Sequence, residues 1–515
     1  MYQYEAYLWE QAKLDDLELP ELVRHMTLMA KRPRFVILVE GGDERNIHTT
    51  ISSIENQIYP AAEIVLDRSA LESQAEECCF LVMLEAGDQL HKRALYEFAC
   101  RIIAVPSAQV IYCDEDVMSL DGKRKEPFVK PDWSPDYLEA MNYIGTAACY
   151  SVELASELLP QADGQYDFTL RLIERTQSIE HIRKILLHRR NSPKIKSDEV
   201  AAREMRALSD RLERTGRKGK IEQNAPYSGS YRATLQLSQN PLVSIIIPTA
   251  GKIVSINGRA RDLIVDCVES IVRRSTYRKI EFVIVDNGDL DRERLDHIRE
   301  IPVRYATFCE PQINISRKMN MGVACAAGEM LILLNDDTEI LTPDWIERLL
   351  YHFEKPHVGA VGAKLLYPDM SIQHAGGVLT SGIPEHVSRW MSQYDPGYFF
   401  SNVGARNFLW VTGAALMTTA RHYREVCGFD EALPLYFNDC DFCMKLNSRG
   451  MTVVYEPSTE LTHFEQLSII PSHRPEDREL YFKKWGHVAT DPYYNEDRLA
   501  LRRPTFAFAN NLRTL

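Results

Sequence analysis

The sequence predicts an α/β protein in which two tandem domains each contain a mostly parallel sheet. Three observations lead to this prediction. Short apolar runs end abruptly in polar or acidic residues, which is typical of buried parallel strands. These runs alternate with segments of helical character, so we expect helices on both faces of each sheet. The same series of runs also occurs twice along the chain, and an internal repeat of this kind predicts a repeated fold.

The composition is that of an ordinary globular protein. The chain has 515 residues, of which 45% are hydrophobic and 26% charged, and this length is enough for two or more domains. The formal net charge of -13 argues against general binding to nucleic acid, but it leaves room for one local basic pocket that holds a nucleotide. Eleven cysteines, an odd number without a framework, indicate free thiols in a reducing cytoplasm.

The sequence contains no candidate membrane span. No run approaches the roughly 18 apolar residues that cross a bilayer, and the N-terminal stretch does not resemble a signal peptide. Residues 1–30 predict an amphipathic helix for packing or docking. We therefore expect a cytoplasmic protein, with peripheral attachment to the inner face of a membrane, through this helix or a partner protein, as the alternative.

The first series of elements follows this helix. Strands are predicted at 35–39, 63–67 and 79–84, with a helix at 49–57 between the first two. The third strand runs into Glu85-Ala86-Gly87-Asp88, a polar tip that contains two carboxylates.

The second series repeats the first. The strands predicted at 243–249, 281–287 and 331–337 match those at 35–39, 63–67 and 81–88 in order and character. The expected organisation is a helical segment at 1–30, a first domain at 31–190, a partly helical linker at 191–240, a second domain at 241–470 and a tail packed on it at 471–515.

Polar side chains follow each strand of the second series, at the edge of a parallel sheet where ligands bind. Asn335-Asp336-Asp337 offers hard oxygen ligands for a divalent cation, and a turn rich in turn-forming residues is the alternative. The carboxylate of Asp286 could accept hydrogen bonds from a base or a ribose, and a helix cap or turn is the alternative there. Pro248-Thr249 closes the first strand, where the backbone can face a flat ring.

The segment from Asn314 to Asn320 begins a helix whose N-terminus and cations would suit a diphosphate. For Arg317 and Lys318, solvated surface charge is the equally good alternative. Small residues later in this helix permit close packing; they are Gly322, Ala324, Ala326, Ala327 and Gly328.

Further acids and a histidine follow. The stretch 410–417 predicts a strand, 428–431 a turn, and Asn438 to Asp441 the start of a helix. Asp439 and Asp441 stand two residues apart and cannot share one helix face, so one is expected in a cleft and the other in a supporting role. His463 follows a strand predicted at 452–457; a structural histidine and an imidazole ligand beside a cation are the two interpretations.

Taken together, these residues resemble glycosyltransferase family 2, inverting enzymes of the GT-A fold that use nucleotide sugars. Five segments match in order: Val243 to Thr249, Val285-Asp286-Asn287, Asn314 to Asn320 with Gly322 and Gly328, Leu334 to Glu339, and Gly428 to Glu431 running into Asn438 to Asp441 with His463 behind. The resemblance is greatest to polysaccharide, O-antigen and rhamnosyltransferase-like members, to which Gln373 to Gly377 and the Asp491 to Asn495 stretch also correspond.

The resemblance implies a role for each residue. It implies that Asp286 reads a pyrimidine base, that Asn335 and Asp336 contact ribose or sugar, that Asp337 and His463 hold Mg²⁺ or Mn²⁺, and that Asp439 is the general base. It also implies nucleotide-sugar contacts for Pro248, Thr249, Asn287, Asn314 and Asn320, and acceptor or support roles for Gln373, His374, Trp410, Gly413 and Asp441. The sequence departs from the family at Asn438, where a glutamate is usual.

The first domain resembles the same family less completely. Its strand-end motif has Gly87 where a carboxylate is usual, and the region around Gln165-Tyr166-Asp167 matches the base position weakly, with His188 near the place of the metal-binding histidine. We expect a divergent, non-catalytic domain. The alternative is a second active transferase, which would make the chain bifunctional or a polymerase.

The resemblance therefore predicts a metal-dependent inverting glycosyltransferase that moves a sugar from a UDP- or dTDP-linked donor, with rhamnose one candidate, to a growing bacterial surface polysaccharide. The expected partners are this nucleotide diphosphate sugar and a saccharide or lipid-linked saccharide acceptor, without nucleic acid and with peripheral membrane or protein-complex association as an option. A non-catalytic scaffold that binds nucleotide sugars or saccharides is the alternative. A nucleotidyltransferase would need a basic glycine-rich loop after the first strand, which Thr249-Ala250-Gly251-Lys252 does not supply.

Overall fold

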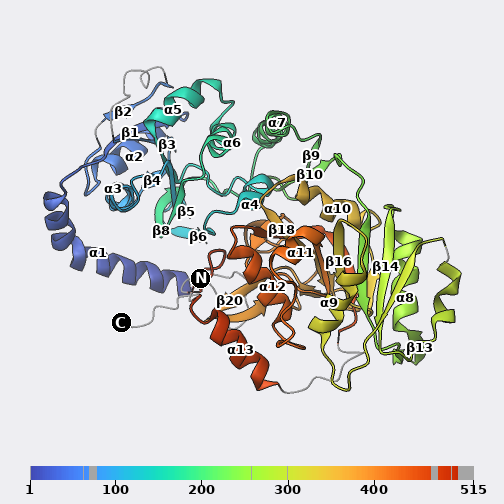
Figure 1. The fold of residues 1–515 in the computed structure, drawn as a ribbon. Coiled ribbons are helices and arrows are strands. Elements are labelled where there is room, and N and C mark those ends of the chain that lie inside the picture. The colour runs from blue at the N-terminus through green and yellow to red at the C-terminus, as the bar shows by residue number, and fades with distance from the viewer. Residues whose placement is uncertain are drawn as a thin grey trace.

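The computed structural model describes residues 2–496 except 62, 69–77, 257, 299, 466–473 and 489. Within this part of the chain, the protein is an α/β molecule with two large mixed sheets, one in each half (Figure 1). The prediction of two α/β units in tandem is confirmed. The prediction that their sheets are mostly parallel is wrong, because β7 and β23 run antiparallel to both of their neighbours. Apolar runs reveal burial of a strand but not its direction.

The first half of the chain forms one sheet with helices on both faces. Its elements are α1 (Tyr2–Leu28), β1 (Arg34–Glu40), α2 (Glu44–Glu55), β2 (Glu63–Val65), β3 (Cys79–Glu85), β4 (Gln89–Leu90), α3 (Ala94–Ala104), β5 (Val110–Met118), β6 (Arg124–Phe128), α4 (Pro135–Ala140), β7 (Ala148–Ser151), α5 (Val152–Leu158), α6 (Gln165–Arg175) and β8 (Ile179–Arg189). The sheet order is β2-β1-β3-β7-β5-β8-β4. A helix α7 (Asp198–Arg214) and a hairpin of β9 (Gly219–Gln223) and β10 (Tyr231–Leu235) lead to the second half.

The second half forms a larger sheet. Its elements are β11 (Val243–Pro248), β12 (Ile253–Ile256), β13 (Arg259–Asp262), α8 (Leu263–Arg274), β14 (Ile280–Asp286), β15 (Val303–Thr307), α9 (Ile315–Cys325), β16 (Met330–Leu334), β17 (Thr338–Ile340), α10 (Trp345–Tyr351), β18 (Val358–Leu366), β19 (Ile372–His374), β20 (Gly377–Thr380), β21 (Ile383–His386), β22 (Arg406–Phe408), β23 (Ala415–Thr419), α11 (Ala420–Glu425), α12 (Asn438–Asn447), β24 (Thr452–His463) and α13 (Pro475–Trp485). The order is β15-β14-β11-β16-β23-β18-β24-β17.

The two sheets have the same topology. If β15 is set aside, the second sheet repeats the first strand for strand, from β14 as the counterpart of β2 to β17 as the counterpart of β4. The parallel and antiparallel relations agree at every step, for example parallel between β5 and β8 and between β18 and β24. The repeat inferred from the sequence therefore extends over the whole sheet.

Several predicted elements differ in extent. The strand expected at 410–417 begins only at Ala415, as β23. Trp410 forms an isolated bridge with Gly377, and residues 411–414 form a loop between the two. The strand expected at 452–457 continues to His463, so this histidine ends β24 instead of following it. The tail expected at 471–515 contains the helix α13, and its residues 497–515 lie outside the described part of the chain. The helix in the linker is confirmed as α7.

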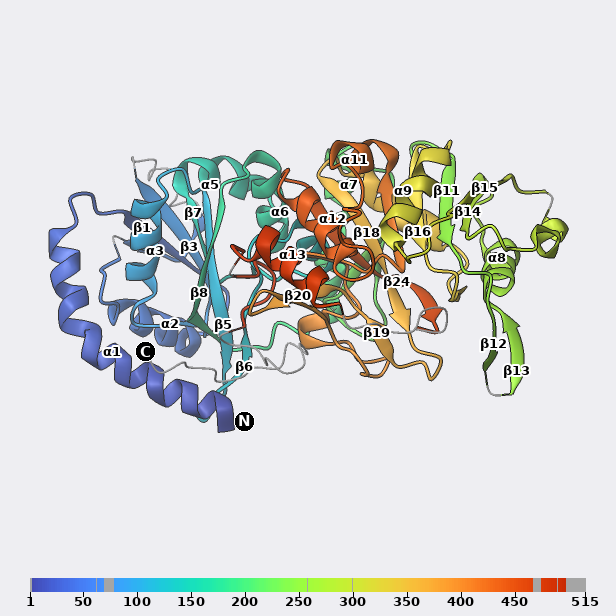
Figure 2. The same ribbon diagram turned by 60° about the horizontal axis from the view of Figure 1, so that its bottom comes forward.

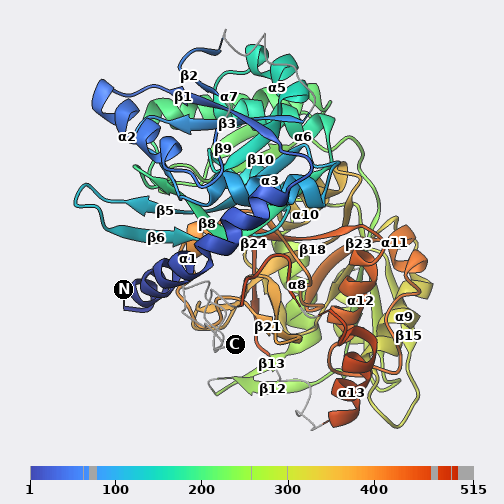
Figure 3. The same cartoon turned by 90° about the vertical axis from the view of Figure 1, so that its left-hand side faces the viewer.

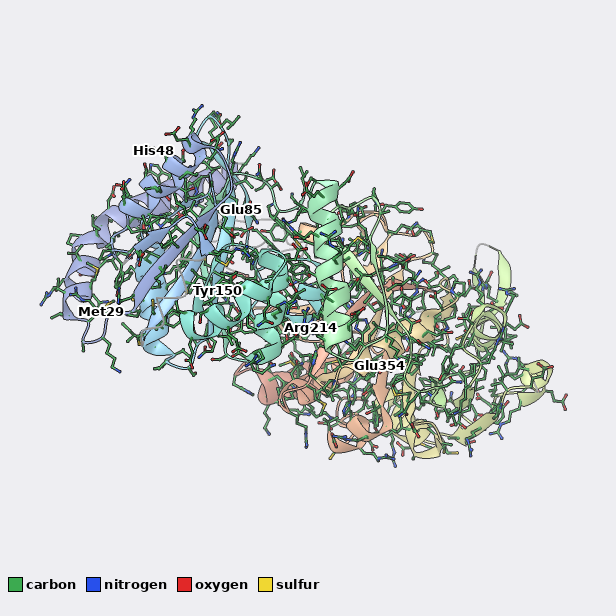
Figure 4. All side chains as sticks on the ribbon, turned by 90° about the horizontal axis from the view of Figure 1, so that it is seen from above. Met29, His48, Glu85, Tyr150, Arg214 and Glu354 are labelled. Carbon is green, nitrogen blue, oxygen red and sulfur yellow. The ribbon has the colours of Figure 1, made fainter. Side chains whose placement is uncertain are left out.

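The two halves pack against each other through their aromatic side chains and through a buried group of charges. The rings of Phe128 and Phe399 stack with their centroids 3.7 Å apart, and Tyr137 donates a hydrogen bond to the Phe399 carbonyl. Asp136 accepts from Asn407 and pairs with Lys355. Helix α7, whose last residue is the labelled Arg214, lies between the two halves (Figure 4).

Three elements lie at the edges of the molecule: the helix α1, the β12–β13 hairpin and the β5–β6 ribbon. Helix α1 lies along the outer side of the first half, and the β12–β13 hairpin projects from the far end of the second (Figure 2). Strands β5 and β6 extend as a ribbon toward the start of α1 (Figure 3), where Tyr4 donates a hydrogen bond to the Asp116 carboxylate. No helix in the described ranges is both long and apolar enough to cross a membrane.

Helix α9 lies directly on the second sheet because it carries a glycine at the contact. A Cβ atom added to Gly322 would stand 2.4 Å from Ile246 Cγ2 and 3.0 Å from Val285 Cγ2. The close approach places the N-terminus of α9 beside the ends of β11 and β14.

Replacing Gly322 with valine is expected to lower the free energy of unfolding by about 1–3 kcal/mol, because the added carbons must displace the side chains of β11 and β14. Chemical denaturation measures the change. The control is Ala324→Val at an exposed position of the same helix, which should cost less than about 1 kcal/mol, the propensity difference alone. Equal losses for both variants would contradict the packing argument.

Candidate active site

A cleft of about 440 Å³ opens at the carboxyl ends of β11, β14 and β16. Eight of the residues predicted from the sequence line it: Pro248, Thr249, Asn287, Asn335, Asp337, Gly413, Asp439 and His463. The other eight predicted residues, Asp286, Asn314, Asn320, Asp336, Gln373, His374, Trp410 and Asp441, are not among its lining residues. The structure therefore brings half of the predicted set into one cleft and places the remainder around it.

Asp337 and His463 face each other across the start of β17. Thr338 pairs with His463 in the sheet, and this places His463 Nε2 3.1 Å from Asp337 Oδ1. The side chain of Gln373 fixes the imidazole by contacting its Nδ1 at 2.6 Å. Burial by itself lowers the pKa of His463, but the Asp337 carboxylate outweighs it and the pKa is raised.

The Asp337–His463 pair fits a divalent cation. Asp337 Oδ1 is buried, makes no hydrogen bond within the described part of the chain and stands 3.1 Å from His463 Nε2, so this oxygen and this imidazole nitrogen could both be ligands of one cation. Asn335 adds an amide 3.2 Å from His463 Nε2. No group of three or more histidine, cysteine or acidic side chains that could hold a metal occurs among the described residues. A cation at this pair would therefore need further oxygen ligands from a bound substrate.

Asp336 turns away from the cleft. It is buried and accepts a 2.6 Å hydrogen bond from Thr249 Oγ1, which in turn accepts from the Gly251 amide. Burial, reinforced by the neighbouring Asp337 charge, raises the pKa of Asp336 to about 7. Its geometry is that of a residue that shapes the Thr249 loop, whereas the prediction gave it a direct ribose or sugar contact.

The end of β14 presents Asn287 to the cleft and keeps Asp286 below it. Asp286 is buried, accepts from the Gly288 amide at 2.7 Å and pairs with Arg292 at 3.2 Å. The asparagine beside it is exposed and lines the cleft. These contacts fit the turn interpretation of Asp286. A contact between Asp286 and a base would have to compete with both partners and stays a prediction.

Asp439 and Asp441 have separate environments, as predicted from their spacing. Asp439 lines the cleft, and its two carboxylate oxygens accept from the Gly413 amide at 2.9 Å and from the Cys440 amide at 2.8 Å. Asp441 is fully buried on the opposite side, where Trp485 donates to it at 2.9 Å and Lys445 and Lys484 pair with it. Asp439 is thus oriented by backbone groups toward the cleft, while Asp441 fixes α13 to α12.

Asn314 and Asn320 hold a turn and do not reach the cleft. Asn314 caps α9 by accepting from the Arg317 amide at 2.9 Å and donates to the Glu431 carbonyl at 2.8 Å. The Asn320 amide donates to Phe429 O and Glu431, each at 3.0 Å, and accepts from Tyr423 and from Phe429 N. Both residues position the 428–431 turn, which carries Phe429 into the cleft wall, and their predicted contact with a nucleotide sugar stays a prediction.

Gln373, His374 and Trp410 support the cleft from behind. Gln373 orients His463, His374 accepts from the Thr412 amide at 3.3 Å, and Trp410 donates to the Val378 carbonyl at 3.2 Å. All three are buried. They fit the support half of their predicted role.

Of the two cations that the sequence left open between a diphosphate and surface charge, Lys318 lies in the cleft wall. Its ammonium group donates to the Thr249 carbonyl at 2.8 Å, and burial lowers its pKa. Its position in the first turn of a helix with small residues toward the sheet was the available signal. Arg317 is half exposed and pairs with Glu310, so surface charge was the right interpretation there. Other lining residues that were not singled out are Lys252, Thr412, Phe429, Tyr436 and Glu465.

The first half contains a counterpart of this site with altered residues. In the second sheet Thr338 pairs with His463, and in the first sheet Gln89 pairs with His188. Asp88 precedes Gln89 as Asp337 precedes Thr338, so Asp88 occupies the place of Asp337. Asp167 pairs with Arg171 and Arg214 as Asp441 pairs with Lys445 and Lys484. This match places Gln165 where the second half has Asp439, and Gln165 donates to the Gly145 carbonyl where Asp439 accepts from Gly413.

Arg189 supplies a positive charge beside Asp88. Its buried guanidinium stands 3.9 Å from Asp88, and 3.6 Å from both Glu85 and Glu115. Burial raises the pKa of Asp88 to about 6 although Arg189 opposes the shift. Residues of α7 cover this counterpart, and the space left is about 70 Å³. The space at this counterpart site is therefore small, and Arg189 already neutralises the charge of its carboxylates.

Comparison with known proteins gives the family of the second half. Residues 244–400 match the family model "Glycosyl transferase family 2". Over this stretch the chain belongs to glycosyltransferase family 2. The match covers the three strand ends of the cleft, from β11 to β16, together with Gln373 and His374.

Curated relatives match most of the chain. It is 34% identical over 459 residues to the protein y4gI of Sinorhizobium fredii, an alignment that covers 84% of this chain and 49% of the relative. It is 31% identical over 440 residues to the O-antigen biosynthesis protein RfbC of Myxococcus xanthus, covering 81% and 33%. An N-acetylglucosaminyl-diphospho-decaprenol L-rhamnosyltransferase of Mycobacterium tuberculosis is 24% identical over 38% of this chain and 69% of its own length. The chain thus spans half or less of the first two relatives.

Replacing Asn320 with alanine is expected to lower the free energy of unfolding by about 1–3 kcal/mol, because the backbone of Phe429 and the hydroxyl of Tyr423 lose their partner. Thermal or chemical denaturation measures this. Asn287→Ala, at an exposed position of the cleft, is the control and should change stability by less than about 0.5 kcal/mol. If Asn320→Ala leaves stability intact and abolishes nucleotide binding, Asn320 contacts the ligand and the positioning role is wrong.

Proposed function

We propose that the second half of the chain is a metal-dependent inverting glycosyltransferase, which moves a sugar from a UDP- or dTDP-linked donor to a growing bacterial surface polysaccharide. One observation carries the proposal: a carboxylate oriented by two backbone amides, Asp439, shares one cleft with the Asp337–His463 pair. Family membership supports the reaction class. The names of two relatives, in O-antigen biosynthesis and in rhamnosyl transfer to a decaprenol-linked sugar, support a lipid-linked saccharide acceptor and rhamnose as a candidate sugar.

Asp439 acts as the general base in this proposal. A sugar hydroxyl is a poor nucleophile until a base takes its proton, and a carboxylate held by two N–H groups is oriented for this without side-chain rearrangement. Attack on the anomeric carbon from the side opposite the leaving diphosphate inverts that centre. The proton is transferred to Asp439, and the nucleoside diphosphate leaves with the electrons of the broken bond.

The donor is placed by the other side of the cleft. Asn287, Pro248 and Thr249 line the end where the nucleoside is proposed to bind, and Lys318 and the N-terminal turn of α9 offer positive charge near the diphosphate. Mg²⁺ or Mn²⁺ held by Asp337 and His463 would neutralise charge on the leaving diphosphate. All eleven cysteines are free thiols, which fits the reducing cytoplasm as the compartment of the reaction.

We further propose one active site per chain. The first half has Gln165 in the place of the base, and an amide cannot take a proton from a hydroxyl. Arg189 already neutralises the carboxylates around Asp88, and little space remains beside them. These differences favour the non-catalytic interpretation of the first domain over a two-site polymerase.

Replacing Asp439 with asparagine is expected to lower kcat by roughly 10²–10⁴-fold, because the amide keeps the shape but cannot accept the proton. Release of nucleoside diphosphate from UDP- and dTDP-sugars, over a set of bacterial oligosaccharide acceptors, measures the change. Asp441→Asn is the matched control two residues away: it should reduce stability through its lost lysine pairs and change kcat far less. Near-normal turnover in Asp439→Asn would show that another group is the base.

The single-site proposal is tested by a pair of equivalent substitutions. Asp337→Asn is expected to lower turnover by more than about 10²-fold and to remove the metal-dependent rise of Tm on donor binding. Asp88→Asn should change both quantities little, since no substrate chemistry depends on it. Titration calorimetry should give one donor per chain. Equal losses in the two variants, or two donors per chain, would instead indicate two active sites.

A further inference from the structure

An aromatic hollow opens on the surface next to the proposed donor cleft. It is lined by Tyr367, Asp369, Arg389, Trp390 and Glu465. Glu465 also lines the donor cleft, so the two spaces adjoin at this side chain. The indole of Trp390 is 57% exposed, although a tryptophan gains stability mainly when it is buried.

The backbone holds this indole outward at an energetic cost. Ser388 and Trp390 have φ values of 57° and 66°, in the left-handed region that side chains with a Cβ disfavour. A residue in this region persists only when its surroundings fix it. Here Trp390 N donates to Ile372 O at 2.7 Å, and Ile372 N donates to Met391 O at 2.8 Å. Burial of the ring does not offset the free-energy cost of this backbone conformation, which points to a functional reason for the exposure of Trp390.

Arg389 makes the hollow rigid and polar at its base. Its guanidinium lies over the Trp390 ring at 4.8 Å, contacts both carboxylate oxygens of Glu465 at 2.9 Å, and donates to Tyr367 at 2.5 Å. An aromatic face beside a carboxylate and a guanidinium is suited to a sugar ring. The C–H face of the sugar packs on the indole, and its hydroxyls can donate to the carboxylate and accept from the guanidinium.

The hollow is connected to the reaction centre through hydrogen bonds. Gln373 donates to Glu465 at 3.4 Å and contacts His463 at 2.6 Å. His463 in turn stands beside Asp337. The residues proposed to hold the nucleoside come from the ends of β11 and β14, whereas the hollow is built from the end of β18, the segment after β21 and the end of β24. The hollow is therefore built from elements other than those proposed to hold the nucleoside.

We propose that Trp390, Arg389 and Glu465 form the acceptor-saccharide subsite, in which Trp390 stacks on a sugar ring of the polysaccharide while the end of that chain enters the cleft toward Asp439. This inference rests on the proposed function and adds to it the place and the means by which the acceptor is recognised.

Trp390→Ala should raise the acceptor KM about tenfold or more while the donor KM moves less than twofold, because the lost stacking affects only the acceptor. Trp390→Phe keeps an aromatic face and should restore most of the loss. Trp9→Ala removes another exposed tryptophan, 66% exposed on α1, and should leave both KM values as in the unchanged protein. A rise in the donor KM instead, or no change in either, would overturn the proposal.

A second measurement does not depend on turnover. Retention of the protein in gels that contain bacterial O-polysaccharide should fall in Trp390→Ala and persist in Trp390→Phe and Trp9→Ala. Equal retention in all variants would overturn the subsite. If the unchanged protein releases no nucleoside diphosphate from any donor, but its retention still requires Trp390, then the glycosyltransferase proposal fails while the saccharide subsite stands.

Discussion

The pairing of β17 with β24 is the constraint on which the site depends. These two strands are joined by a three-residue antiparallel register in which Thr338 faces His463, and Phe464 N also donates to Asp337 O at 3.0 Å. Without this register the imidazole and the Asp337 carboxylate, far apart in sequence, would not meet. The rest of the cleft is arranged around the pair: β11 and β14 bring their ends to one side, and the start of α12 brings Asp439 to the other.

The same frame in the first half shows what the fold determines and what the side chains determine. Gln89 faces His188 as Thr338 faces His463, so the backbone still brings an acid and a histidine together. However, His188 contacts Asp116 at 2.7 Å, and Asp88 has Arg189 beside it. A duplicated sheet thus keeps the backbone geometry of the site while its side chains differ, and in the first half a guanidinium stands beside the carboxylate. The fold alone does not provide the chemistry.

Much of this arrangement could be predicted from the sequence because the ends of buried strands can be recognised in it. Apolar runs such as 331–334 stop at polar tips, and parallel neighbours bring those tips together. What the sequence could not give was the direction of each side chain beyond the strand. Asp336 and Asp337 are adjacent, yet one turns into the Thr249 loop and the other to the cleft. Asn320 and Lys318 lie on the same helix, yet Asn320 bonds to the backbone of the 428–431 turn whereas Lys318 lines the cleft. The exposure of Trp390 could not be predicted from hydrophobic periodicity, because Trp390 lies in an irregular segment with a left-handed backbone conformation.

The contacts between the halves give the first domain a structural task even without chemistry of its own. The segment that carries Trp390 continues to Tyr398 and Phe399, which insert against Phe128 and the backbone of Pro127 in the first half. Farther along the chain, Asp491 accepts from Leu379 N at 2.7 Å while the next carbonyl, of Pro492, accepts from Asp132 N at 2.7 Å. The first domain therefore braces both the segment after β21 and the β20–β21 hairpin from outside. The segment that holds the exposed, strained Trp390 beside the cleft is therefore packed against a surface that the first domain supplies.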